Sequence, residues 1–398
     1  MPISVTAMKR KMKMEAINKD KLLFSPGPLT TSATVKGAML RDLGSLDSEF
    51  LATVHNIRTR LLDLGPYPPK DYECILMQGS GTFVVESVIS SAIPRDGKLL
   101  VLVNGAYGRR IAKQAQVYGI ALEVFEVAEN IKFTAALVTE YLASASGFTH
   151  VAVVHCETTS GMLNQVEEIG HVVHAAGASY IVDAMSSFGA VPIDMVGSHI
   201  DFLVSSANKC IEGVPGFGFV LAKRSALDAA KGNARTLSLD LYDQWAGMER
   251  DGHFRFTPPI HTILAFEQAL NELDEEGGVS ARGERYRQNH LALCRGMKTL
   301  GFEIYLADED QSFIITSFRY PASPAFQFAD FYERLWTLGF AIYPGKLSYE
   351  SCFRIGTIGR ISISDIEALL TAIGKVLREM GVCSNSELIQ EQASALTH

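Results

Sequence analysis

Short runs of apolar residues alternate with longer amphipathic segments along the first two thirds of the chain. Uninterrupted runs predict buried strands at 74–77, 99–103, 122–125, 151–154, 180–182 and 202–204. Helical spacing lies between most of these runs, near 84–93, 106–118, 133–144, 165–176 and 186–190. Continuous Val, Ile and Leu runs indicate strands that are covered on both faces, so we predict a mostly parallel sheet under helices. A further run at 216–221 follows so closely that it is expected to return antiparallel.

The pattern changes twice in the remainder of the chain. It loosens between about 225 and 260, and Glu275-Glu276-Gly277-Gly278 then marks a break. A long helix at 279–300 leads to a unit with predicted strands at 304–305, 313–318, 340–343 and 353–356 and helices at 325–337 and 364–380. The fold class is therefore α/β. We expect an N-terminal arm (1–21), a large domain (22–278), a smaller C-terminal α+β domain (279–383) and a polar tail (384–398).

The composition of the chain argues against several classes of partner and site. The 398 residues are 47% hydrophobic and carry a formal net charge of -8, which disfavours nucleic acid as a partner. Six cysteines are spaced singly without a CxxC pair, so neither a metal centre nor a disulfide framework is indicated, and a cytoplasmic location is expected. The basic N-terminal stretch lacks the apolar core of a secretory signal. No apolar run reaches the roughly 20 residues of a membrane helix.

Polar side chains gather at the carboxyl ends of the predicted strands, where ligands bind in sheets of this kind. Ser80-Gly81-Thr82 stands between a strand and a helix, so backbone amides and two hydroxyls can form a phosphate cup. The GxGxxG spacing of a dinucleotide site and the GK[ST] of a Walker loop are both missing.

Each of the other polar groups at this edge of the sheet can be interpreted as structural or as functional. Lys209 follows the 202–204 strand and on its own would be an ordinary loop lysine. Asp183 ends another strand, as either a helix cap or a buried functional carboxylate. Tyr107 on its own suggests core packing. Arg354 stands inside an apolar strand and needs an anionic partner.

One cofactor uses all these groups together. Pyridoxal phosphate requires a lysine that forms a Schiff base, a carboxylate beside the pyridinium nitrogen, a phosphate site and groups flanking the ring. Lys209 and Asp183 at neighbouring strand ends meet the first two requirements, and the 80–82 turn meets the third. A nucleotide-binding module would use the same turn, but it leaves Lys209 and Asp183 unexplained.

The chain resembles the fold type I pyridoxal-phosphate aminotransferases of the alanine–glyoxylate and serine–pyruvate branch, over about residues 22–380. The segments that carry the resemblance are Leu23–Ser32, Gln78–Thr82, Val103–Gly108, Glu157–Gly161, Val182–Gly189, Ser205–Cys210 and Arg354–Gly359. Within this branch it is most similar to members with a phosphonate donor. The resemblance therefore implies transfer of the amino group of 2-aminoethylphosphonate to pyruvate, in phosphonate catabolism.

The resemblance also implies roles for individual residues. Lys209 would be the Schiff-base lysine and proton carrier, and Asp183 would pair with the ring nitrogen. The other implied cofactor contacts are Ser80, Gly81 and Thr82 at the phosphate, Tyr107 stacked on the ring, Thr159 at the ring hydroxyl and Thr257 at the phosphate of a partner subunit in a homodimer. Arg354 would bind the substrate anion, with Ser25 and Gly27 completing the substrate site.

Two further classes stay open. An alanine–glyoxylate or serine–pyruvate transaminase would share the cofactor and differ in its amino donor. A non-catalytic regulator that binds the cofactor is the alternative from a different class, although no DNA-binding segment is recognisable. A cysteine desulfurase is disfavoured because no cysteine stands in an evident mobile loop.

Overall fold

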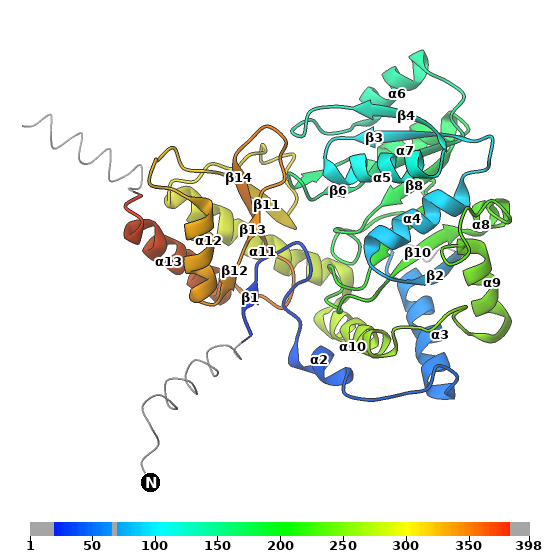
Figure 1. The fold of residues 1–398 in the computed structure, drawn as a ribbon, viewed down its shortest axis with the longest axis horizontal. Coiled ribbons are helices and arrows are strands. Elements are labelled where there is room, and N and C mark those ends of the chain that lie inside the picture. The colour runs from blue at the N-terminus through cyan, green and yellow to red at the C-terminus, as the bar shows by residue number, and fades with distance from the viewer. Residues whose placement is uncertain (1–19, 66–69, 383–398) are drawn as a thin grey trace, which may run out of the picture.

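A computed structural model describes residues 20–65 and 70–382 (Figure 1). The predicted arm and tail therefore lie almost wholly outside the described residues. Seven strands form the central sheet, in the order β2-β10-β9-β8-β5-β3-β4. Their bounds are β2 Tyr72–Gln78, β3 Lys98–Val103, β4 Ala121–Glu126, β5 His150–Val154, β8 Ser179–Asp183, β9 Phe202–Ser206 and β10 Phe217–Lys223.

The direction of the strands confirms the predicted sheet. β4, β3, β5, β8 and β9 pair in parallel, and β10 runs antiparallel to both β9 and β2. Strand residues alternate between two apolar layers, because successive side chains point to opposite faces of a sheet. In β3, for example, Leu100 and Leu102 join one layer, whereas Leu99, Val101 and Val103 join the other.

Helices cover both faces of this sheet. The layer of Leu100 is closed by α3 Ser48–Leu62, α6 Ala135–Ser144, α7 Val166–Ala175 and α10 Ile260–Glu276. The layer of Leu99 is closed by α4 Gly81–Ala92, α5 Ala106–Val117, α8 Arg224–Ala229 and α9 Leu241–Asp251. Both faces are therefore buried, as the uninterrupted apolar runs predicted. The short helix α2 Ala33–Ala38 packs on α10.

A separate apolar cluster holds the C-terminal unit (yellow to red in Figure 1). Its sheet is antiparallel in the order β11-β14-β13, with β11 Ile315–Arg319, β13 Tyr343–Pro344 and β14 Cys352–Gly356. The helices are α11 Gly278–Thr299, α12 Phe328–Thr337 and α13 Ile363–Glu379. The strand β1 Leu22–Leu23 pairs with β12 Phe340–Ala341, so the segment before the large domain is tied to this unit. The domain boundary at residue 278 remains a prediction.

Two predicted elements were wrong. No helix forms at 186–190, where turns lead to Gly189 at φ +93°, a left-handed conformation that ends helical geometry. The predicted strand at 304–305 is only an isolated bridge from Ile304 to Phe318. A small antiparallel pair, β6 Cys156–Glu157 with β7 Met162–Leu163, was not predicted. In the part of the chain that the structure describes, no helix is long and apolar enough to cross a membrane.

Candidate active site

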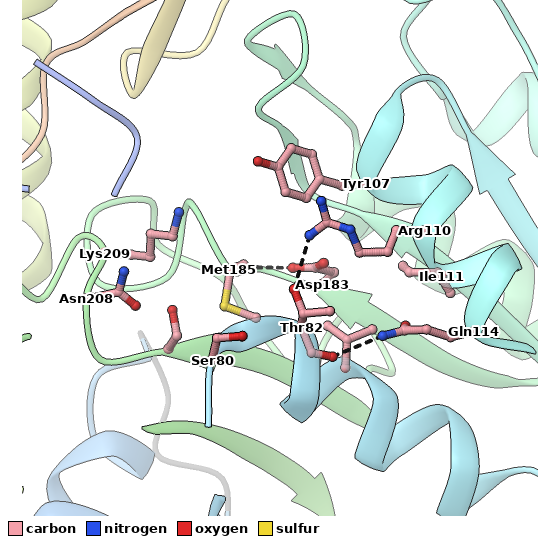
Figure 2. A pocket seen from close by; sticks show the side chains of 13 residues that line it. Ser80, Thr82, Tyr107, Arg110, Ile111, Gln114, Asp183, Met185, Asn208 and Lys209 are labelled. Atoms are coloured by element: carbon pink, nitrogen blue, oxygen red, sulfur yellow. Dashed lines mark hydrogen bonds between the residues drawn. The ribbon is translucent and has the colours of Figure 1, made fainter. Parts of the chain in front are cut away.

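One pocket lies at the carboxyl ends of β2, β8 and β9, beside the first turns of α4 and α5 (Figure 2). It gathers six of the predicted site residues, namely Ser80, Gly81, Thr82, Tyr107, Asp183 and Lys209. In Figure 2 Asp183 lies near the centre, between Lys209 on the left and Arg110 on the right, and Tyr107 lies above it. Asp183 and Lys209 come from neighbouring parallel strands, because β8 pairs directly with β9.

The start of α4 forms the base of the pocket. Ser80 is the N-cap residue, has extended backbone angles and makes no capping bond with its side chain, which leaves its hydroxyl and the first helical amides available. A Cβ on Gly81 would lie 2.4 Å from Sδ of Met185, so a larger residue here would displace the Met185 side chain. Thr82 accepts a hydrogen bond from Arg110 at 3.1 Å. This cup of amides, hydroxyls and a cation suits a phosphate group.

Arg110 is a site residue that the sequence reasoning missed. It stands three positions after Tyr107 on α5, so both side chains lie on the same face of that helix. Its guanidinium lies 4.8 Å from the centre of the Tyr107 ring and also lines the pocket. Its position three residues after Tyr107, within a segment already predicted to be helical, could have identified Arg110 from the sequence.

The carboxylate of Asp183 is buried at the end of β8. Its Oδ1 accepts a hydrogen bond of 2.9 Å from the amide of Met185, and no basic side chain of the described residues forms an ion pair with it. Burial raises the pKa of Asp183 to about 6, only partly offset by this bond and by Lys209 and Arg110. A cation placed beside Asp183 in the pocket would therefore be stabilised.

The amine of Lys209 is held by the N-terminal loop. Its Nζ donates a hydrogen bond of 2.7 Å to the carbonyl of Pro26. Burial lowers the pKa of Lys209, although Tyr107 and Asp183 act in the opposite direction. Gly27 has φ +120°, and a Cβ there would lie 2.7 Å from Cδ of Lys209. This loop thus fixes a lysine that loses its proton more readily than an exposed one.

Tyr107 lies in the first turn of α5 and is positioned by Glu157, a second buried carboxylate whose role was not predicted. Glu157 accepts hydrogen bonds from the amides of Tyr107 and Gly108, and from the hydroxyl of Thr159 at 2.5 Å. Burial raises the pKa of Glu157 despite these bonds. Carboxylate acceptors stabilise helix N-termini, so Glu157 fixes the first turn that carries Tyr107.

Arg354 lies on β14, beside Tyr107 and outside the lining of the pocket. The side chain is 1% exposed, and its guanidinium donates to the carbonyls of Pro344 at 3.0 Å and Thr158 at 2.7 Å. Burial lowers the pKa of Arg354, and the neighbouring Tyr107 offsets part of this lowering. Among residues 20–65 and 70–382, no acidic side chain forms an ion pair with it. A buried guanidinium supplied only with neutral carbonyls retains the capacity to bind an anion.

The remaining predicted residues lie near the pocket or away from it. Ser25 is buried and bonds through its hydroxyl to Pro28 and Gly27, inside the same loop as Pro26. The hydroxyl of Thr159 is occupied by Glu157 and by the amide of Ala106 at 2.8 Å. Thr257 is exposed, and its carbonyl accepts a bond from Gln78. The cofactor contacts predicted for Thr159 and Thr257 stay predictions.

The residues of the pocket fit pyridoxal phosphate. The amine of Lys209, whose pKa is lowered, suits the aldehyde of this cofactor. The carboxylate of Asp183 has no cation beside it among the described residues, and a protonated nitrogen of the cofactor ring would supply one. Ser80, Gly81 and Thr82 offer a phosphate cup, and Tyr107 offers an aromatic face. Met185 closes the pocket against Gly81.

Comparison with known proteins identifies a family from the sequence and a matching fold among solved structures. The family model described as Aminotransferase class-V matches residues 30–334. The 2-aminoethylphosphonate–pyruvate transaminase of Salmonella heidelberg is 49% identical over 358 residues, which are 89% of this chain and 97% of that protein. The enzyme of the same name from Lysinibacillus sphaericus is 50% identical and covers 88% and 96%. Pyridoxamine–pyruvate aminotransferase from Mesorhizobium loti superposes with a TM-score of 0.83 at 25% identity, over 91% and 93% of the two chains.

Proposed function

The chain belongs to the class-V aminotransferase family, and we propose that it transfers the amino group of 2-aminoethylphosphonate to pyruvate, giving phosphonoacetaldehyde and L-alanine. Relatives that are 49% and 50% identical in sequence are named for this activity. In this chain the proposal is carried by Arg354, a buried guanidinium beside the lysine pocket with no acidic partner among the described residues. Both the phosphonate of the donor and the carboxylate of pyruvate are anions that it can bind.

The cofactor is pyridoxal phosphate, which supplies an aldehyde that condenses with amines and a ring that accepts the electron pair released when a C–H bond breaks. Asp183 would keep the ring nitrogen protonated, because a buried carboxylate without a cation favours a proton or positive charge next to it. Ser80, Gly81 and Thr82 would hold the phosphate at the start of α4.

Lys209 has two tasks in this proposal. Its amine would hold the aldehyde of the cofactor, and in its neutral form the same amine would accept the proton from the amine-bearing carbon of the donor. Burial favours the neutral form that this transfer needs. The hydrogen bond to Pro26 keeps the amine on the substrate side of the pocket.

Arg354 and the 25–27 loop orient the substrate. The guanidinium binds the anionic end of either substrate, so the amine-bearing carbon comes to rest near Lys209. Ser25 and Gly27 complete this side of the site, since their loop contacts both Lys209 and the end of β14. A Cβ on Gly356 would overlap the carbonyl of Ser25, which shows how closely the two segments pack.

Amino-donor profiling tests the proposed function. Purified protein loaded with pyridoxal phosphate should convert 2-aminoethylphosphonate and pyruvate to L-alanine and phosphonoacetaldehyde in equal amounts. Activity with alanine and glyoxylate, or with serine and pyruvate, and none with the phosphonate would establish the rival transaminase instead. A coloured protein that turns over no amino donor would indicate the non-catalytic regulator.

We also propose that the protein is a homodimer in which Thr257 reaches the phosphate of the partner subunit. Thr257 follows Phe256, which is 44% exposed and lies under the guanidinium of Arg255. Arg255 also donates a hydrogen bond to the carbonyl of Leu237, whose side chain is 75% exposed. Apolar side chains exposed together favour an interface between copies. Gln78 ties this segment to the strand that leads into the phosphate cup.

Hybrid dimers test the shared site. Lys209→Ala and Thr257→Glu subunits should each be inactive alone, whereas mixing them by unfolding and refolding should restore about a quarter of the wild-type activity, from the one intact site of each hybrid dimer. No recovery despite confirmed mixing would place Thr257 outside the partner's site.

We further infer a cytoplasmic location. The five cysteines in the described part of the chain are buried and unpaired, which is typical of proteins kept in a reducing compartment. Fractionation of the native host with antibody detection checks this location, and recovery with an exported fraction would contradict it.

A further inference from the structure

The hairpin loop between β13 and β14 reaches from the C-terminal unit to the entrance of α5. Ser348 donates from its amide and its hydroxyl to the carboxylate of Glu129, both at 2.9 Å. Glu129 is only 4% exposed and also forms an ion pair with Arg109 at 2.8 Å. A second ion pair, between Arg319 and Glu350, holds the base of the loop. The loop therefore has a defined position next to the pocket.

This position brings a second cation to Tyr107. The Nζ of Lys346 lies 5.0 Å from the centre of the Tyr107 ring and 3.5 Å from its hydroxyl. Among the described residues no carboxylate forms an ion pair with Lys346. Arg354 belongs to the same hairpin and bonds to the carbonyl of Pro344, two residues before Lys346.

Lys346 is therefore one of three cations, with Lys209 and Arg354, whose charge acts on the hydroxyl of Tyr107. Burial alone would raise the pKa of Tyr107, but Thr158 together with Lys209, Lys346 and Arg354 lowers it. Lys346 and Arg354 form no ion pair with a carboxylate among the described residues, so this end of the pocket can attract an anion. During turnover Lys209 acts as the neutral base of the proposed reaction, which leaves Lys346 and Arg354 as the cations that meet the substrate anion.

The charge of the two proposed substrates differs. Pyruvate carries one negative charge on its carboxylate, which one guanidinium matches. A phosphonate carries up to two, spread over three oxygens, so it has room for a second cation. We propose that Lys346 binds the second charge of the phosphonate and thereby selects 2-aminoethylphosphonate as the donor. This inference rests on the proposed function and assigns the donor specificity of that site.

Kinetics of the two half-reactions test this assignment. In a ping-pong reaction kcat/KM is measured separately for the phosphonate and for pyruvate. Lys346→Met should lower kcat/KM for 2-aminoethylphosphonate about tenfold, mainly through KM, because the lost contact is an ionic hydrogen bond at a partly solvated site. The value for pyruvate should change less than about threefold. Lys346→Arg should restore most of the loss.

A matched control is available on another surface. Lys231 is also exposed and lies 5.4 Å from the centre of a tyrosine ring, that of Tyr242. Lys231→Met should leave both half-reactions unchanged. Equal losses for the two substrates in Lys346→Met, or no loss for the phosphonate, would overturn the inference while the proposed function stands. Wild-type protein that does not use 2-aminoethylphosphonate would instead refute the proposed function, and this inference with it.

Discussion

The buried carboxylate of Asp183 should destabilise the cofactor-free protein, and Asp183→Asn should reveal the cost. Asparagine keeps an oxygen for the amide of Met185, and its NH2 faces the pocket, where water can accept its hydrogen bonds. Burial raises the pKa of Asp183 from 3.8 to about 6. Each tenfold change in the ionisation equilibrium corresponds to about 1.4 kcal/mol, so ionised Asp183 costs up to about 3 kcal/mol at pH 8.

The sign of the difference in the free energy of unfolding follows from how the ionisation of Asp183 depends on pH. Between about pH 4 and 6 the folded protein binds more protons at this site than the unfolded chain, so wild-type stability falls as pH rises through that window. The asparagine variant does not titrate there. It should therefore be more stable than wild type by up to about 3 kcal/mol at pH 8, and by about 1.5 kcal/mol at pH 5.

Urea unfolding of the cofactor-free proteins at both pH values measures this difference. The same variant, loaded with pyridoxal phosphate, should lose at least about a hundredfold in kcat, because the ring nitrogen loses its carboxylate. A variant that is less stable than wild type at pH 8, or a stability difference that does not change with pH, would show that ionised Asp183 does not destabilise the folded protein.

Three further substitutions probe the site and its support. Arg354→Gln should lower kcat/KM for both substrates by about a hundredfold or more while cofactor retention, followed by absorbance, stays unchanged; parallel loss of the cofactor would make this arginine structural. Gly27→Ala should lower both kcat and the free energy of unfolding, the latter by about 1–3 kcal/mol, since its Cβ meets Lys209 at a positive φ; an unchanged urea midpoint would show that the loop relaxes. Glu276→Gln removes the ion pairs of Glu276 with fully buried Arg282 at 2.5 Å and with Arg285 at 2.6 Å, and should cost about 3 kcal/mol in urea unfolding; a cost under about 0.5 kcal/mol would match exposed pairs instead.

The local pattern was enough to predict the central sheet. Uninterrupted apolar runs marked its strands because both faces are buried, and the short gap before 216–221 correctly indicated an antiparallel return. The same pattern could not find α9, because Leu241, Trp245 and Met248 stand among charged residues and contribute only one narrow apolar face. It also failed at 186–190, where Gly189 adopts a conformation that apolar spacing does not encode.

The candidate site was predictable where its residues follow strand ends. Asp183 and Lys209 could be placed together because β8 and β9 are consecutive and parallel. Contacts between distant segments carried no such signal. The bond of Lys209 to Pro26, the bond of Ser348 to Glu129 and the approach of Lys346 to Tyr107 all depend on how the C-terminal unit and the N-terminal loop pack against the large sheet.

The role of Lys209 is tested by measuring formation of L-alanine from 2-aminoethylphosphonate and pyruvate by the wild-type protein and by Lys209→Ala, both loaded with pyridoxal phosphate. We expect steady turnover by the wild type and a loss of at least about a thousandfold in the variant, because the group that binds the aldehyde and carries the proton is gone. The variant should remain folded, since Lys209 makes a single side-chain hydrogen bond among the described residues. Turnover by Lys209→Ala at a rate near that of the wild type would contradict the central role of this lysine.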